Sequence, residues 1–269
     1  MTNDSATNYD KDIHNDYDKY RKASQITIDK ILDIIGKNKK VLSLGCGTGS
    51  YEAVLSNYLN VEGIDLSKEM AAKAIEKGVN AKTGDMRSLE YEDNTFDAVY
   101  AIQSFHHVAE SFNLSGAERY DERLKVIKEA FRVLKKGGVL VIIQSDPEQN
   151  KAVWFWKYFS KALEKKLVIQ SKIEEIKNMM ETTGFKNIDS EAYADFLFRN
   201  FYDESGPLKK EFRASYSEFG YLNAREIEKG CELLKKDIET RKVSRVIEEG
   251  KEKFNRLGGN LTIVDGKKF

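Results

Sequence analysis

Three glycines at alternate positions follow a short apolar run, and this feature constrains the fold more than any other in the chain. The run covers residues 41–44, and the glycines are Gly45, Gly47 and Gly49. Glycine accepts a positive φ without steric cost and lets a ligand approach the bare backbone. The pattern therefore predicts a strand, a tight loop and then a helix over residues 50–58, whose free N–H groups face whatever the loop holds.

The spacing of the loop argues against two common phosphate-binding patterns. A dinucleotide fingerprint needs a third glycine where Ser50 stands, and a phosphate loop needs a lysine that this loop lacks. A second apolar segment, residues 61–65, ends in Asp65, whose carboxylate can accept hydrogen bonds from a ribose diol. Together the loop and this carboxylate indicate a nucleoside ligand without a phosphate.

Three motifs in fixed order resemble those of the class I S-adenosylmethionine-dependent methyltransferases. They are Leu-x-Leu-Gly-Cys-Gly-Thr-Gly at residues 42–49, Gly-Ile-Asp-Leu-Ser at residues 63–67 and Gly-Asp-Met at residues 84–86. The resemblance covers residues 20–146 well and is greatest to the small-molecule branch that includes the ubiquinone/menaquinone and trans-aconitate methyltransferases. It implies an α/β, Rossmann-like fold: a seven-stranded, mostly parallel sheet in the order 3-2-1-4-5-7-6, with strand 7 antiparallel, helices on both faces and a helical cap.

The resemblance also implies where S-adenosylmethionine, the methyl donor, would bind. Asp85 would accept a hydrogen bond from the adenine amino group, and Met86 and Leu66 would line the ring. Residues 1–20 would either close over the donor as a lid or form a flexible tail, and Arg21 would meet the donor's carboxylate. The candidate donor-binding residues are Tyr20, Arg21, Gly45, Cys46, Gly47, Thr48, Gly49, Asp65, Leu66, Met70, Gly84, Asp85, Met86, Gln103, Ser104 and Phe105.

Polar residues follow the two strands predicted over residues 96–102 and 139–143. The carboxyl ends of parallel strands meet at the ligand side of such a sheet, so His106 and His107 should lie near Asp146. If the acceptor is a hydroxyl, we expect His107, or less favourably His106, to act as general base while Asp146 orients the imidazole. Adjacent residues of an extended segment point to opposite sides, so one histidine at most should serve.

Two alternatives to base catalysis remain open. A histidine ring can simply pack against the loop, and an amine, thiol or carboxylate can attack the methyl group without a base. A metal site that uses His106 and Glu110 is not favoured, because the chain has only 3 histidines.

The chain beyond Pro147 is helical and rich in aromatic residues. We interpret residues 147–184 and 194–259 as cap helices on the substrate side of a single domain, residues 1–269. Their aromatic side chains should shape the acceptor pocket, unless the rings only attach the cap to the sheet. A final apolar segment, residues 260–264, predicts the seventh strand.

Local signals in the second half of the chain also predict three helix boundaries. The aromatic residues of segment 154–159 should share one helix, and Ser171 and Glu174 should form a capping box. The Lys-Lys-Gly-Gly segment at residues 135–138 should end the helix before the fifth strand.

Composition restricts the class of partner. Lysine plus arginine equals aspartate plus glutamate at 44 each, so no overall field favours nucleic acid or an anionic membrane. No apolar run reaches the ~18 residues of a membrane span, and no signal-peptide pattern is present. Cys46 and Cys231 give no disulfide framework. We therefore expect a cytoplasmic monomer or homodimer that acts on a small-molecule acceptor.

Three other functions stay open on the sequence alone. A protein could bind the donor without transferring methyl, or methylate RNA, although the Asn/Asp-Pro-Pro-aromatic motif of base-amine methylation is missing. An NAD-linked oxidoreductase would need glycine in place of Ser50.

Overall fold

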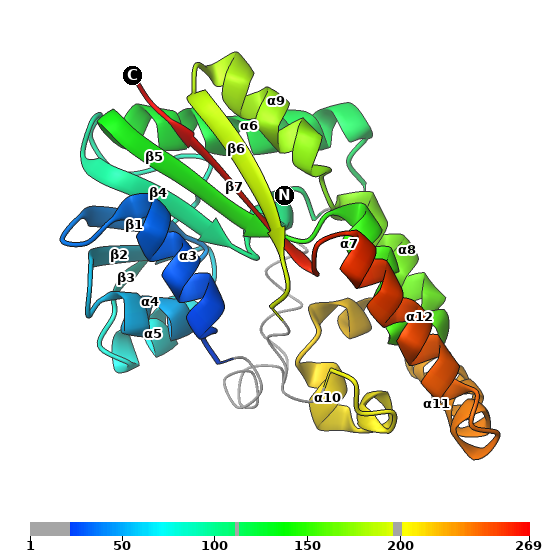
Figure 1. Ribbon diagram of the computed structural model, residues 1–269. Helices are drawn as coiled ribbons and strands as arrows, with labels where there is room; N and C mark the ends of the chain where they lie inside the picture. The colour runs from blue at the N-terminus through cyan, green and yellow to red at the C-terminus, as the bar shows by residue number, and fades with distance from the viewer. Residues whose placement is uncertain (1–21, 111–112, 196–200) are drawn as a thin grey trace.

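A seven-stranded sheet forms the centre of the protein, in the order β3-β2-β1-β4-β5-β7-β6 (Figure 1). The computed structural model describes residues 22–110, 113–195 and 201–269 of the chain. β1 to β5 are parallel, and β7 is antiparallel to β5 and β6, so the predicted order and direction are confirmed. The strands are β1 (Lys40–Leu44), β2 (Asn60–Asp65), β3 (Asn80–Thr83), β4 (Phe96–Ile102), β5 (Leu134–Gln144), β6 (Lys186–Tyr193) and β7 (Leu261–Lys267).

Helices cover both faces of the sheet, because apolar side chains leave the central strands in both directions. On β1, Leu42 and Leu44 belong to the buried cluster under α6 and α9, whereas Val41 belongs to the cluster under α3 and α4. This alternation is the period of a strand, and burial on both faces explains the nearly continuous apolar runs. The helices are α3 (Gln25–Ile35), α4 (Ser50–Leu55), α5 (Lys68–Glu76), α6 (Gly116–Val133) and α9 (Ile173–Thr183).

Apolar side chains from residues 147–169 and 201–259 pack into a second buried cluster, and we call these two segments the cap. The ring of Phe155 lies at its centre and contacts Phe212, Tyr216 and Phe219 at centroid distances of 5.4, 5.0 and 6.1 Å. In Figure 1 the cap extends from the carboxyl ends of the parallel strands. Its elements are α7 (Pro147–Lys151), η2 (Trp154–Lys157), α8 (Ser160–Ile169), η3 (Gly206–Leu208), α10 (Lys210–Ala214), η4 (Ser217–Tyr221), α11 (Ala224–Glu239) and α12 (Val243–Arg256).

Two of the predicted helix boundaries are wrong. Residues 154–159 do not share one helix: η2 is a short 3-10 helix, and α8 begins only at Ser160, so that the aromatic rings can turn into the cap cluster. Residues 135–138 do not form the end of α6 but belong to β5. The pairing of β5 with β4 starts before them, at Leu134 and Phe96, and resumes after an irregularity at Val139 and Ala98.

The predicted capping box at Ser171 is also wrong. The N-cap of α9 is Lys172, which forms no side-chain cap bond. The N–H of Ile173 instead donates to Oδ2 of Asp146 at 3.1 Å, and Oδ1 of Asp146 accepts the N–H of Glu148 at 3.0 Å to cap α7. Asp146 therefore fixes the beginnings of two helices.

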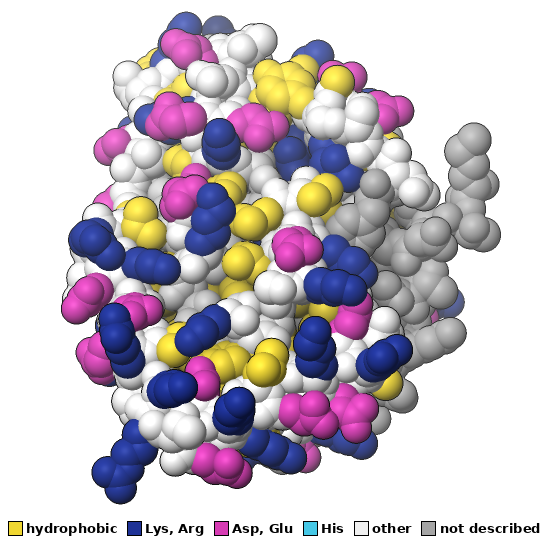
Figure 2. Space-filling model, turned by 90° about the vertical axis from the view of Figure 1, so that its right-hand side faces the viewer, with side chains coloured by type: hydrophobic (Ala, Val, Ile, Leu, Met, Phe, Trp, Pro, Cys, Tyr) yellow, Lys and Arg dark blue, Asp and Glu magenta, His cyan; other side chains and the backbone are white. Residues whose placement is uncertain are grey.

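The surface carries both signs of charge in close mixture. Figure 2 shows basic and acidic side chains interspersed over one face, with apolar side chains between them. This face has no extended patch of one sign of the kind that binds a polyanion. None of the helices in the described ranges has the length and apolarity that a membrane crossing requires.

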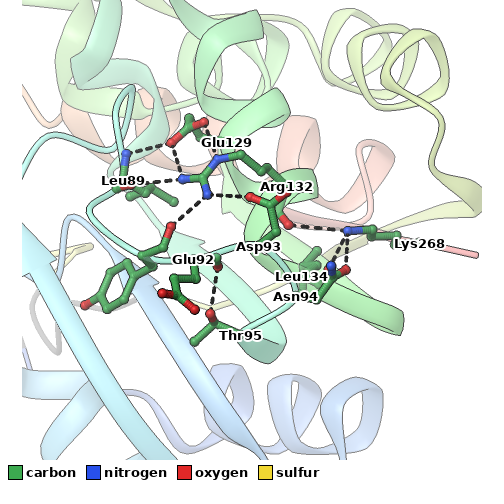
Figure 3. A network of polar contacts seen from close by, with 10 residues as sticks. Leu89, Glu92, Asp93, Asn94, Thr95, Glu129, Arg132, Leu134 and Lys268 are labelled. Carbon is green, nitrogen blue, oxygen red and sulfur yellow. Dashed lines mark hydrogen bonds and ion pairs between the residues drawn. The ribbon is translucent and has the colours of Figure 1, made fainter.

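Arg132, near the carboxyl end of α6, holds the loop that precedes β4 (Figure 3). Its guanidinium donates to the carbonyl oxygens of Tyr91 and Leu89 at 2.7 and 2.9 Å. Glu129 pairs with Arg132 at 2.8 Å and also accepts the N–H of Leu89 at 2.7 Å, and Asp93 adds a second ion pair at 2.9 Å. The network links a sheet-covering helix to the turn that starts a central strand.

We predict that Arg132→Ala lowers the free energy of unfolding by about 1–3 kcal/mol, because two carbonyl oxygens of the loop lose a charged donor. Urea unfolding measures the change. Arg245→Ala is the matched control, since the Arg245 side chain is 86% exposed and its ion pair among the described residues is with Glu249, so its effect should stay below about 0.5 kcal/mol. Equal, small effects of both substitutions would contradict a structural role for the network.

Candidate active site

A cavity of about 300 Å³ lies where the carboxyl ends of β1, β2 and β4 meet the cap. This volume is at the lower end of the range typical of small-molecule sites. The structure brings most of the predicted site residues together in its lining: Gly45, Cys46, Gly47, Thr48, Asp65, Leu66, Met70, Gly84, Asp85, Met86, Gln103, Ser104, His106 and His107.

Three predicted residues of the described ranges, Gly49, Phe105 and Asp146, are not in this lining. Two others, Tyr20 and Arg21, lie outside the described residues. Phe105 is fully buried in the cluster under α6, and Gly49 packs beside α5. Both residues therefore pack against the elements around the cavity and do not face its interior.

The three glycines of the loop all adopt left-handed backbone conformations, with φ of 71°, 55° and 75° at Gly45, Gly47 and Gly49. A Cβ on Gly45 would lie 2.6 Å from Cβ of Ser104, so close packing adds a second reason for glycine there. A Cβ on Gly47 would meet nothing within 4 Å, and Gly47 lines the cavity. The loop therefore leaves room for a ligand against its backbone.

Asp65, at the end of β2, is fixed by backbone donors. Its Oδ2 accepts the N–H of Gly47 at 2.8 Å, and its Oδ1 accepts the N–H of Ser67 at 2.9 Å. Burial raises the pKa of Asp65, although the two backbone bonds and the neighbouring His107 oppose this effect. Each oxygen keeps a further lone pair, so the carboxylate can still accept from a diol in the cavity.

Asp85 has a protein partner that the sequence did not reveal. Nε and Nη2 of Arg87 donate to its carboxylate at 3.0 and 2.6 Å, and Nη1 of Arg87 continues to Glu122 at 2.7 Å. Although burial opposes ionisation, the bonds from Arg87 hold the pKa of Asp85 below its usual range. Asp85 can contact a ligand only through lone pairs that this ion pair leaves.

The chain leaves β4 through an unusual backbone conformation. Gln103 has φ of 53°, a value that non-glycine residues rarely adopt, and its N–H donates to the carbonyl oxygen of Ile143 at 2.8 Å. Ser104 then donates from Oγ to the carbonyl oxygen of Leu44 at 2.5 Å. These bonds connect the end of β4 to its neighbours β1 and β5 at the floor of the cavity.

The two histidines lie on a 3-10 helix, η1 (Phe105–Ala109), and not on the extended segment that we expected. The expectation that they point to opposite sides is therefore wrong. Their ring centroids are 4.1 Å apart, and both side chains line the cavity.

The carboxylate that orients His107 is Glu110, not Asp146. Nδ1 of His107 lies 2.7 Å from Oε2 of Glu110, and Oε1 of Glu110 accepts the hydroxyl of Tyr221 at 2.6 Å. An ionised carboxylate only accepts, so Nδ1 carries the proton and Nε2 is the basic nitrogen of the ring. Burial opposes ionisation of Glu110, but the contacts with His107 and Tyr221 hold its pKa below the usual value. Asp146 cannot take this role while it caps α7 and α9.

His106 has a different partner, the buried Lys166 of α8. Nζ of Lys166 lies 2.9 Å from Nε2 of His106 and 3.0 Å from Glu218 of η4. An ammonium group has no acceptor, so Nε2 of His106 must accept and its proton lies on Nδ1. In His106 the basic nitrogen, Nε2, is the atom that contacts the Lys166 ammonium. In His107 the contact with Glu110 uses the other nitrogen, Nδ1.

Sequence reasoning missed Glu52, Lys166, Tyr221 and Glu218, all of which contribute to the cavity or its hydrogen bonds. On α8, Lys166 lies on the same buried face as Ala162 and Ile169. A charged residue on an otherwise apolar helix face was the sequence signal that could have identified it. The partners of Tyr221 and Glu218 carried no local signal.

The donor half of the cavity fits a nucleoside without phosphate. The loop offers open backbone at Gly47, and a carboxylate follows at Asp65. Residues 45–49 themselves contain no arginine or lysine, and the lysine that reaches the loop, Lys77, donates from Nζ to Oγ1 of Thr48 at 3.2 Å. Within the described ranges, no three His, Cys, Asp or Glu side chains group as metal ligands. These features fit the adenosine part of S-adenosylmethionine, whose ribose diol can donate to the Asp65 carboxylate.

Comparisons with known proteins agree with this geometry. A family described as a methyltransferase domain matches residues 42–142. Demethylmenaquinone methyltransferase of Staphylococcus aureus is 31% identical over 182 residues, which cover 57% of this chain and 70% of the relative.

Two solved structures share the fold. A protein of Anabaena variabilis, assigned as a methyltransferase from an antibiotic biosynthesis pathway, superposes with a TM-score of 0.73 at 22% identity and covers 92% of this chain and 98% of its own. Phosphoethanolamine N-methyltransferase 2 of Haemonchus contortus, in complex with S-adenosyl-L-methionine, gives 0.61 at 18% identity and covers 99% of this chain and 60% of its own. The chain belongs to the class I S-adenosylmethionine-dependent methyltransferases, with their Rossmann-like fold and methyl donor.

Proposed function

We propose that this enzyme methylates a hydroxyl group of a small-molecule acceptor, and that His107 is the general base. The observation that carries the proposal is the 2.7 Å contact between Nδ1 of His107 and Glu110 at the cavity wall. It gives the imidazole a fixed orientation and a defined tautomer. A hydroxyl acceptor gains most from such a group, because it must lose its proton as it attacks.

The proton would pass from the acceptor hydroxyl to Nε2 of His107, and the carboxylate of Glu110 would stabilise the imidazolium that forms. When bound, S-adenosylmethionine supplies a methyl group on a positively charged sulfur. The glycine loop and Asp65 would hold the nucleoside end of the donor. The protein's task is then to orient the two reactants, which can supply about 7–11 kcal/mol of the barrier reduction.

The walls contributed by the cap support a small acceptor with a flat, apolar body. Trp156, Phe201 and Tyr216 line the cavity beside the polar groups of Asn150 and Lys166. Aromatic walls with a few polar groups are typical of small-molecule sites. The relative in Staphylococcus aureus is named for a quinone-type acceptor, demethylmenaquinone. The mixed charges of Figure 2 give no support to RNA as the acceptor.

The function is tested by a metabolite screen for S-adenosylhomocysteine release, and the base by single substitutions with the acceptor so found. We predict that His107→Ala lowers kcat at least about 10²-fold at saturating donor, since a positioned base contributes ~10²–10⁴. His106→Ala should lose much less, because Nε2 of His106 is engaged by Lys166. Calorimetric donor affinity should change less than about threefold in both variants. Near wild-type turnover of both would refute the base and indicate an amine, thiol or carboxylate acceptor.

We also predict that Glu110→Gln lowers kcat about 10-fold or more, because the neutral amide cannot stabilise the imidazolium. Tyr221→Phe is the matched control at the same carboxylate: it removes one hydrogen bond to Glu110 and keeps the charge. Its loss should be only a few-fold. Steady-state kinetics of both variants decide the matter, and a Tyr221→Phe loss as large as that of Glu110→Gln would mean that the network acts only by shaping the cavity.

A further inference from the structure

Glu52 is a buried carboxylate that none of the steps above uses. It lies in the first turn of α4, directly after the glycine loop, and lines the cavity although the residue is only 3% exposed. Its Oε1 accepts a hydrogen bond from Oγ of Ser43 at 2.7 Å and from the hydroxyl of Tyr100 at 3.3 Å. Because Ser43 is on β1 and Tyr100 is on β4, the carboxylate lies beneath the junction of these strands.

No cation of the described residues offsets this carboxylate at ion-pair distance. Another acid, Asp65, lies close enough to disfavour a negative charge on Glu52. Burial raises the pKa of Glu52, the bonds from Ser43 and Tyr100 oppose this effect, and Asp65 adds to it. Carboxylates are almost never fully buried without a partner, since desolvation costs several kcal/mol per ion. The site thus fits a ligand that brings a positive charge.

The order of acidic groups along the edge of the sheet indicates which positively charged group of the ligand would lie at Glu52. Asp85 follows β3 and Asp65 ends β2, the positions expected for adenine and ribose, and Glu52 lies next in this order, bonded to Ser43 of β1 and Tyr100 of β4. The methionyl part of the donor continues from the ribose in that direction. It carries a sulfonium and an α-ammonium, and only the ammonium has N–H groups that a carboxylate can accept.

We propose that Glu52 binds the α-ammonium group of S-adenosylmethionine and so positions the methionyl end of the donor. The residue does not touch the transferred methyl. It fixes the chain that carries the sulfur, and thereby the direction of the bond that breaks. The inference rests on donor binding by this family and is independent of the acceptor and of His107, so that failure of either proposal leaves the other standing.

The experiment is a thermodynamic cycle on donor binding, which needs no acceptor. Calorimetry measures the affinity of wild type and Glu52→Gln for S-adenosylhomocysteine and for its deaminated analogue, in which hydrogen replaces the amino group. Gln keeps an oxygen for Ser43 and Tyr100, so the fold should persist, and thermal unfolding checks this. In the wild type we expect the analogue to bind about 10–100-fold more weakly, the usual worth of a charged hydrogen bond. In Glu52→Gln the two ligands should bind within about threefold of each other.

Two comparisons separate this role from a structural one. Glu76→Gln, an exposed carboxylate on α5, should keep the full discrimination against the deaminated analogue. S-adenosylmethionine should lose affinity in Glu52→Gln by the same factor as S-adenosylhomocysteine, since both carry the ammonium. If the variant discriminates against the analogue as the wild type does, the proposal is overturned. It is also overturned if only S-adenosylmethionine weakens, which would assign Glu52 to the sulfonium.

Discussion

One carbonyl oxygen connects the glycine loop to the sheet, and the donor half of the site depends on it. The carbonyl oxygen of Ile64, near the end of β2, accepts the N–H groups of Gly45 and Cys46 at 2.8 and 2.9 Å. The next N–H group along the loop, that of Gly47, donates to Oδ2 of Asp65. These contacts turn the chain out of β1 in a defined direction and start α4 with Glu52 facing the cavity. A slip of β1 against β2 would displace all of these groups together.

The topology could be predicted because the motifs of the first five strands occur in a fixed order, each with its own loop residues. Helix ends were less predictable, because local signals compete with distant partners. Residues 135–138 look like a helix end, yet Leu134 just before them already pairs with Phe96 of β4, and the N–H of Gly137 donates to the carbonyl oxygen of Lys268 at 2.6 Å. Ser171 looks like a cap, yet Asp146 reaches the same helix from the end of β5. Tertiary hydrogen bonds overrode the local preference in both cases.

The cavity lining at the carboxyl ends of β1 and β2 could be predicted for the same reason, since its residues lie in short, contiguous motifs. The partners that the cap brings to the two histidines could not be predicted. Lys166 is 60 positions from His106, and Tyr221 is 111 positions from Glu110, so only the folded cap brings them together. Glu110 was within reach of sequence reasoning: three residues after His107, it shares a face of one helical turn. The wrong assumption of an extended segment directed attention to Asp146 instead.

Each histidine depends on a hydrogen bond from the cap. Lys166 contacts His106 directly, and Tyr221 donates to Glu110, the carboxylate beside His107. The same cap supplies the aromatic wall of the cavity. Under the proposed mechanism, the choice of acceptor and the proton transfer therefore depend on the same segment of the chain. A chimera that exchanges the cap for that of a relative would change the protonation pattern of the site along with its shape, even if every residue of the sheet stayed the same. A variant with another cap must therefore keep Lys166 and Tyr221, or replace both, to preserve the hydrogen bonds of His106 and Glu110.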